Sequence, residues 1–256
     1  MARQTDYQTI APVFDRRYQV HDYEGVENAL RAFLGSQTRV DILDCGCGTG
    51  HWLTKLASPG RHVIGLDASA EMLMYAARGK QSKLVHAQAE YLPFETGSFD
   101  RVFCVNSFHH FASKRVFISE VRRVLKPRGG FTTVGLDPHT GLDKWWIYDY
   151  FENALDLDKQ RYLLQKSTID MLTAVGFVDC HTDIVQRFAV AVSARRSLDR
   201  GDVARTSTSQ LTILTDEEYQ RGVLRIQADM VTAQRRGQEL LLLSDLRLYA
   251  TTAWLR

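Results

Sequence analysis

Cysteine is scarce in this chain, and long apolar runs are absent from it. The four cysteines, Cys45, Cys47, Cys104 and Cys180, show neither the spacing of a metal site nor the density of a disulfide framework. Nowhere are about 18 consecutive residues apolar, as a membrane-spanning helix requires, and the segment behind Met1 lacks the apolar core of a signal peptide. We therefore expect a reduced, cytoplasmic protein without a membrane span and without a bound metal.

An excess of charge of either sign is also missing. The chain has 32 Lys and Arg residues against 30 Asp and Glu residues, which gives a formal net charge of +2. Nucleic acid is not expected as a partner, because phosphate binding normally needs a concentrated basic surface. A chain of 256 residues with 45% hydrophobic content can bury a full core, so we expect a single folded domain.

The most informative segment runs from Val40 to Gly50. An apolar strand ends there in Asp44, and Gly46, Gly48 and Gly50 follow at alternate positions. Glycine accepts positive φ angles and has no Cβ, so such a turn lets a ligand approach the backbone N–H groups closely. A carboxylate at this place favours a cationic amine over a phosphate.

Two other glycine-rich motifs do not fit this segment. His51 occupies the position at which a dinucleotide fingerprint needs its third glycine. The Lys and Ser/Thr residues that end a phosphate-binding P-loop are missing after Gly50. The spacing therefore disfavours a dinucleotide oxidoreductase and a nucleoside triphosphatase.

The remaining D-x-G-x-G-x-G run resembles motif I of the class I S-adenosylmethionine-dependent methyltransferases. Further segments resemble later motifs of that family in the same order: residues 61–67, which end in Asp67, then 83–94, 99–106 and 125–131. The resemblance extends over residues 38–136 and is closest to the small-molecule methyltransferases of ubiquinone and menaquinone biosynthesis. Most relatives have aspartate where this chain has Gln88, whose amide can still donate to and accept from an adenine edge.

Strand and helix patterns alternate from Val40 onward, which favours parallel strands joined by crossover helices. The resemblance implies an α/β fold: a Rossmann-like, mostly parallel sheet of seven strands with helices on both faces. Its last strand is expected to be antiparallel and inserted between strands five and six. Periodicity and capping predict helices at 70–78, 114–125 and 167–175, with Ser167 as the last cap, a helix after Thr215, and final strands at 178–184 and within 240–250.

We expect one methyltransferase domain, residues 1–256, with three kinds of segment. Residues 1–37 form a helical arm, and residues 38–136 form the cofactor-binding core. Residues 137–166 and 193–237 are insertions that build a helical, aromatic lid over the substrate, since apolar sites are often walled by aromatic side chains. Plain packing of the aromatic residues is the alternative interpretation.

The resemblance also implies which residues hold S-adenosylmethionine. Asp44 and the glycine turn would hold its amino-acid end, and the Asp67 carboxylate would accept from two ribose hydroxyls. The complete expected set is Tyr18, Asp44, Gly46, Cys47, Gly48, Gly50, Asp67, Ala68, Met72, Gln88, Ala89, Glu90, Asn106 and Ser107. His110 and His109 are the candidate catalytic residues, because a histidine can take a proton from an acceptor near neutral pH; a purely structural role is the alternative.

The sequence thus predicts an enzyme that transfers a methyl group from S-adenosylmethionine to a small-molecule acceptor and leaves S-adenosylhomocysteine. The acceptor atom, an O, N or C nucleophile, would attack by in-line displacement, so the protein mainly positions the reactants. An RNA methyltransferase and a non-catalytic protein that binds S-adenosylmethionine are the alternatives. The identity of the acceptor and the oligomeric state stay open.

Overall fold

The computed structural model describes residues 15–36, 39–79 and 83–256. Its eight-stranded sheet has the order β3-β2-β1-β4-β5-β8-β6, and β7 also pairs with β8. Strands β1 to β5 are parallel, and β8 is antiparallel to β5, β6 and β7. The strands are β1 (Val40–Cys45), β2 (Arg61–Asp67), β3 (Lys83–His86), β4 (Phe99–Val105), β5 (Leu125–Gly135), β6 (Lys144–Trp145), β7 (Val178–Ser193) and β8 (Leu241–Trp254).

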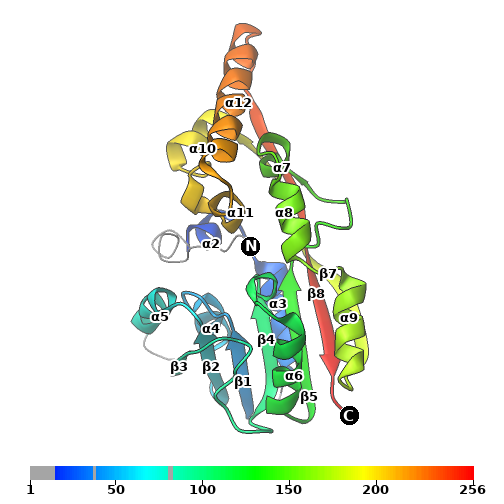
Figure 1. Cartoon of the computed structure of the whole chain (residues 1–256). Coiled ribbons are helices and arrows are strands. Elements are labelled where there is room, and N and C mark those ends of the chain that lie inside the picture. The colour runs from blue at the N-terminus through cyan, green and yellow to red at the C-terminus, as the bar shows by residue number, and fades with distance from the viewer. Residues whose placement is uncertain (1–14, 37–38, 80–82) are drawn as a thin grey trace.

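Helices lie between most strands and in the two predicted insertions (Figure 1). The α-helices are α2 (Arg16–Val20), α3 (Glu24–Leu34), α4 (His51–Leu56), α5 (Ala70–Ala76), α6 (Lys114–Val124), α7 (Trp146–Tyr150), α8 (Ala154–Arg161), α9 (Gln165–Ala174), α10 (Ala194–Arg200), α11 (Ser209–Thr212) and α12 (Asp216–Arg235). Short 3-10 helices occupy Ala77–Gly79, Phe108–His110 and Arg205–Ser207. No helix of the described ranges is both long and apolar enough to cross a membrane.

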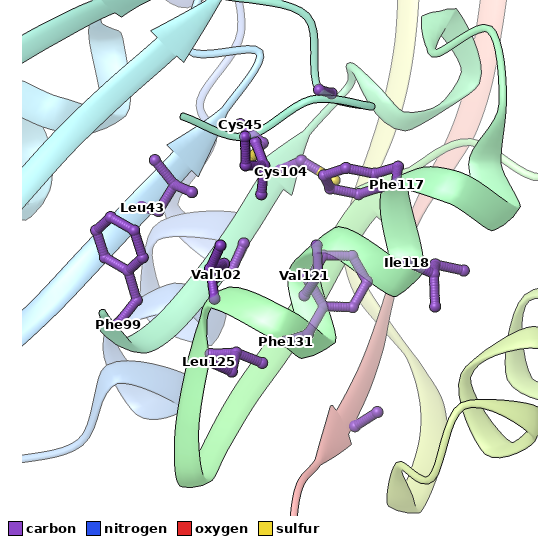
Figure 2. Close-up of a cluster of buried hydrophobic side chains, with 14 of the residues drawn as sticks. Leu43, Cys45, Phe99, Val102, Cys104, Phe117, Ile118, Val121, Leu125 and Phe131 are labelled. Carbon is purple, nitrogen blue, oxygen red and sulfur yellow. The ribbon is translucent and has the colours of Figure 1, made fainter. Parts of the chain in front are cut away.

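The sheet is covered on both faces, as predicted, because successive residues of a strand point to opposite sides. Leu43 of β1 packs with Phe117 and Val121 of α6 in one buried cluster, which Figure 2 shows. Its neighbour Ile42 packs with Leu30 of α3 and belongs to a second cluster on the other face. The central strands are therefore buried on both sides, which is typical of parallel sheets.

The predicted antiparallel strand lies where it was expected, between β5 and β7. The pairing of β7 with β8 runs from Val178 and Trp254 to Ser193 and Leu241, so β7 is much longer than the predicted 178–184. A register shift between Ile184 and Gln186 interrupts the alternation, which then resumes. Beyond this shift, residues 186–193 and 241–248 form an extension of the sheet, called the ribbon below, which β6 joins at residues 244 and 245.

The helices of the two insertions gather along the ribbon, above the carboxyl ends of β1 and β4 (Figure 1). They share a hydrophobic cluster of their own, in which Ile147 and Phe151 from the first insertion meet Ile226 from the second and Leu242 of the ribbon. We call residues 144–161 and 194–235 the cap layer. Its longest helix, α12, starts with the predicted cap: Thr215 accepts from the N–H of Glu218, and the Glu218 carboxylate accepts from the N–H of Thr215.

Two helix boundaries and one added strand also differ from the sequence prediction. Helix α9 begins at Gln165, so Ser167 lies inside it and caps nothing. Helix α5 ends at Ala76, and a 3-10 turn completes the predicted span. Strand β6 is an added eighth strand of two residues, held only by its pairing with Asp245 and Ser244 of β8. A strand that short has no periodicity of its own that a sequence could reveal.

Candidate active site

The glycine turn after β1 is tied to the end of β2. The N–H groups of Gly46 and Cys47 both donate to the carbonyl of Leu66, at 2.7 and 3.0 Å. Gly46 has φ +74°, and a Cβ placed on it would lie 2.5 Å from the Cβ of Ser107. Only glycine fits this position, because both its backbone angle and the adjacent strand end exclude a side chain.

Asp44 stands beneath this turn with a carboxylate oxygen that no protein group satisfies. The residue is 1% exposed, and its Oδ2 atom has no hydrogen-bond partner among the described residues. Burial, and then the charge of Asp67, raise the pKa of the Asp44 carboxyl. A buried acceptor without a donor is costly, so the position fits a cationic amine from a ligand.

Asp67 ends β2, next to the same turn. Its Oδ2 accepts from the N–H of Gly48 at 2.8 Å, and its Oδ1 accepts from the N–H of Ser69 at 2.8 Å. Burial raises the pKa of Asp67, although these N–H groups act in the opposite direction. Each carboxylate oxygen keeps a further lone pair, so two hydroxyl groups of a ribose can still bind there.

Tyr18 of the N-terminal arm lies against the start of α4. Its ring stacks on that of His51 with centroids 3.5 Å apart and planes 3° from parallel. The hydroxyl of Thr49 donates to the carboxylate of Asp15, which ties the arm to the glycine turn. Burial raises the pKa of the Tyr18 phenol. Residues 1–14, the first part of the predicted arm, lie outside the described residues.

The other expected cofactor residues divide into buried and exposed groups. Cys47, Met72, Ala89 and Glu90 are buried, and Glu90 accepts from the N–H of Ser113 at 3.0 Å. Ala68 and Gln88 are exposed. Gly50 has φ +82° and precedes the first residue of α4. For these seven residues, contact with the cofactor stays a prediction.

Asn106 and Ser107 follow β4 and lie between the glycine turn and a large cavity. The Ser107 hydroxyl donates to the carbonyl of Cys45 at 2.9 Å, directly beside Gly46. Asn106 has φ +52°, an uncommon backbone conformation for a residue with a side chain, and it lines the cavity. The end of β4 thus joins the predicted cofactor site to a second compartment.

That cavity has a volume of about 360 Å³. Its walls come from the arm, the end of β4, the ribbon and both insertions; they include Arg17, Tyr23, Asn106, His109, His110, Trp145, Trp146, Tyr162, Phe188, Arg200 and Leu246. The predicted catalytic histidines therefore face the same space as the aromatic residues of the first insertion. A cavity of this kind suits a small molecule with an apolar body.

His109 and His110 lie next to each other at the base of this cavity, with ring centroids 3.8 Å apart. His109 is 7% exposed, and its Nε2 lies 3.2 Å from the hydroxyl of Tyr162. Burial, and then nearby cationic side chains, lower the pKa of His110; burial, the neighbouring His110 and the same cations lower the pKa of His109. Both imidazoles are therefore neutral at pH 7, the form that a proton acceptor needs, while the same burial and cations weaken their basicity.

Tyr162 is the functional candidate that the sequence did not reveal. It lines the large cavity, stacks on His109 with centroids 4.0 Å apart, and comes from the first insertion, 53 positions away.

His139, which follows β5, forms a hydrogen bond through its Nε2 to the carbonyl of Tyr162 and so supports the loop. Among the described residues, no three His, Cys, Asp or Glu side chains gather as a metal site would require.

Residues 43–133 match the family described as "Methyltransferase domain". A malonyl-[acyl-carrier protein] O-methyltransferase from Legionella pneumophila is 38% identical over 60% of this chain and 59% of its own length. A demethylmenaquinone methyltransferase from Staphylococcus aureus is 33% identical over 48% of this chain and 55% of its own length. A crystal structure of a candidate methyltransferase from an antibiotic biosynthesis pathway of Anabaena variabilis has a TM-score of 0.68 at 21% identity, covering 92% of this chain and 99% of that one.

The match to the crystal structure concerns the fold, because the sequence identity is low. The chain spans about half the length of the curated relatives that it matches. The matched segment contains the end of β1, all of β2 and β4, the glycine turn and both carboxylates described above. Over residues 43–133 the chain is therefore similar to methyltransferase domains, in agreement with the resemblance of its glycine turn to motif I.

Proposed function

We propose that this protein transfers a methyl group from S-adenosylmethionine to a small-molecule acceptor held in the large cavity. The observation that carries the proposal is the junction at Asn106 and Ser107. There the glycine turn, with the unsatisfied Asp44 carboxylate beneath it, meets a cavity lined by His109 and His110. A charged nucleoside can thus bind on one side of the end of β4, and an apolar acceptor can bind on the other side.

The protein's part in this reaction is positioning and proton acceptance. Asp44 and the glycine turn would hold the amino-acid end of the cofactor, and Asp67 would hold its ribose. When bound, the cofactor supplies a methyl group on a sulfonium, which is already activated toward a nucleophile. His110 faces the cavity as a neutral imidazole, so it can take the proton from an acceptor hydroxyl or amine as the acceptor atom bonds to the methyl carbon.

The cofactor assignment is tested by ligand-induced stabilisation. We expect S-adenosylmethionine and S-adenosylhomocysteine to raise the melting temperature, and NAD and ATP to leave it unchanged, because a ligand that binds only the folded state stabilises it by mass action. A thermal-shift titration with all four compounds provides the measurement. Stabilisation by NAD and none by the two sulfur nucleosides would contradict the assignment.

We further propose that the cap layer is the acceptor lid. Trp145 and Trp146 from the first insertion, together with residues 197, 200–202, 204 and 206–210 from the second, line the cavity that the histidines face. This arrangement supports separate binding of the two ligands: the core holds the cofactor and the insertions hold the acceptor.

Trp146→Ala should therefore raise the acceptor KM by roughly tenfold and leave the affinity for S-adenosylhomocysteine unchanged, because a half-buried indole contributes about 1.5 kcal/mol of apolar contact. Trp254→Ala is the matched control, since Trp254 packs on Phe33 and Arg101 at the far end of β8. The control should lower the melting temperature and leave the acceptor KM unchanged. Equal acceptor KM values for both variants would mean that Trp146 only packs.

We place the protein in the cytoplasm, because all four cysteines are free thiols and three of them are buried.

The expected partner is the small-molecule acceptor. An RNA acceptor is the second candidate from the sequence, and it would show activity that falls steeply with salt concentration. The formal charge of +2 does not favour it.

A further inference from the structure

The walls of the large cavity differ in chemistry. The ribbon supplies apolar side chains, with Phe188, Val190 and Val192 from β7 and Leu242, Leu246 and Leu248 from β8. Trp145, Trp146 and Ile147 continue this apolar surface. Flat indole rings beside branched aliphatic chains favour a planar, apolar ligand body.

The arm and the second insertion supply a polar wall. Arg16 and Arg17 come from α2, Arg200 ends α10, and residues 206–210 are Thr, Ser, Thr, Ser and Gln. Arg16 donates to the backbone carbonyl of Arg200, so the two segments meet at this wall. The cavity thus has guanidinium groups from two elements that are far apart in the sequence but adjacent in space.

The charges on this wall are not balanced. Asp202 is the acidic residue among the described residues of the lining, and its Oδ2 accepts from both the Nε and the Nη2 of Arg200, at 3.0 and 2.5 Å. In the part of the lining that the structure describes, three arginines stand against one aspartate. A partly desolvated surface with excess positive charge attracts an anion. It disfavours a neutral ligand, because such a ligand leaves the positive charge of the wall without a partner.

The positive potential extends to the base of the cavity. Burial lowers the pKa of His110, and the charges of Arg161, Lys114 and Arg17 lower it further. Arg161 pairs with the buried carboxylate of Asp158, yet its Nε and Nη1 atoms are buried without a hydrogen-bond partner among the described residues. An anion in the cavity would therefore gain from cations on two sides.

Resting on the methyltransferase function above, we propose that the acceptor is an aryl carboxylate: a planar apolar body against Trp145 and Trp146, with its carboxylate facing Arg17 and Arg200. Guanidinium groups bind carboxylates through paired, charge-assisted hydrogen bonds, which gives orientation as well as affinity. Fixing the carboxylate at the arginine wall orients the opposite end of the ligand toward the histidines. The same wall would exclude uncharged aromatic molecules of similar shape.

The test compares acids with their uncharged amides. The protein is first saturated with S-adenosylhomocysteine. Three acids and the primary amide of each are then titrated into it calorimetrically: benzoate, indole-3-acetate and 4-hydroxycinnamate. We expect at least one acid to bind about tenfold more tightly than its amide, as charge-assisted hydrogen bonds allow. Arg17→Gln and Arg200→Gln should remove most of this preference, and Arg17→Lys and Arg200→Lys should retain part of it because they keep the charge.

Arg195→Gln is the matched control, because Arg195 lies on the exposed side of the same helix α10 and does not line the cavity. This variant should keep the full preference for the acid. Amides that bind as tightly as the acids, binding by none of the probes, or an equal loss in Arg195→Gln and Arg200→Gln would overturn the proposal. Failure to bind S-adenosylhomocysteine in the same samples would instead count against the methyltransferase function itself.

Discussion

Replacing Asp44 with asparagine is expected to weaken the binding of S-adenosylhomocysteine by about 2 to 3 kcal/mol, roughly a hundredfold, because a buried charge partner for the ligand amine is lost. The stability of the ligand-free protein should not fall. Asp44 is 1% exposed and its Oδ2 lacks a partner among the described residues, so the wild-type carboxyl is itself a cost to the fold. Calorimetric titration and thermal unfolding of both proteins measure the two effects.

The dependence on pH has a definite sign. Burial, and then the charge of Asp67, raise the pKa of Asp44 in the ligand-free protein. The free energy of unfolding of the wild type therefore falls as the pH rises above the unfolded carboxyl pKa of about 4. Asp44→Asn removes this loss. The melting temperature of the variant, relative to that of wild type, should therefore increase as the pH rises. A cationic amine favours the ionised carboxyl, so in the pH range in which the ligand-free carboxyl is protonated, ligand binding should release a proton from wild type and none from the variant.

Asp41→Asn is the control for the change of charge. Asp41 lies on the same strand but is only half-buried and pairs with Lys126 at 2.6 Å. Its replacement should leave the affinity for S-adenosylhomocysteine and the proton release unchanged. If both variants weaken binding equally, the effect of Asp44 comes from net charge and not from a contact with the ligand.

Phe151→Ala is expected to cost about 3 to 5 kcal/mol of stability in the cap layer, because truncating a buried phenylalanine leaves a cavity. Phe151 is 1% exposed and packs so closely on α12 that a Cβ on Gly222 would lie 2.2 Å from its ring. Hydrogen exchange should show lost protection in residues 144–161 and 194–235 and retained protection in β1 and β4. Acceptor binding should fail while S-adenosylhomocysteine still binds.

The matched variant is Phe117→Ala, the same truncation in the cluster between α6 and the sheet (Figure 2). It should reduce protection across the central strands and weaken the binding of S-adenosylhomocysteine. A Phe151 variant that loses the cofactor as completely as the Phe117 variant would show that the core and the cap layer unfold together. The lid would then have no independent stability.

The sequence predicted the core well because its signals are local. The glycine turn, the acidic strand ends at Asp44 and Asp67, and the helix cap at Thr215 each depend on residues within a few positions of one another. Strand β7 was predicted too short because the register shift at Ile184 breaks its alternation, and only pairing with β8 shows that it continues. The start of α9 was misplaced because a serine resembles a cap whether or not the chain uses it.

The acceptor side could not be read from local patterns. The contact of Tyr162 with His109 spans 53 positions, and the meeting of Arg16 with Arg200 spans 184. Such contacts depend on how the insertions pack on the ribbon, and no periodicity within either segment encodes that packing. The stacking of Tyr18 on His51 likewise joins the arm to the glycine turn through tertiary structure alone.

Transfer of a labelled methyl group tests the central claim most directly. The protein is incubated with methyl-tritiated S-adenosylmethionine and a cell extract separated into a small-molecule fraction and an RNA fraction. We predict label in one or more small molecules, none in RNA, and a loss of most of the transfer in Asp44→Asn at a subsaturating concentration of S-adenosylmethionine. Label in RNA, or label in neither fraction although S-adenosylhomocysteine binds, would contradict the proposal of a small-molecule methyltransferase.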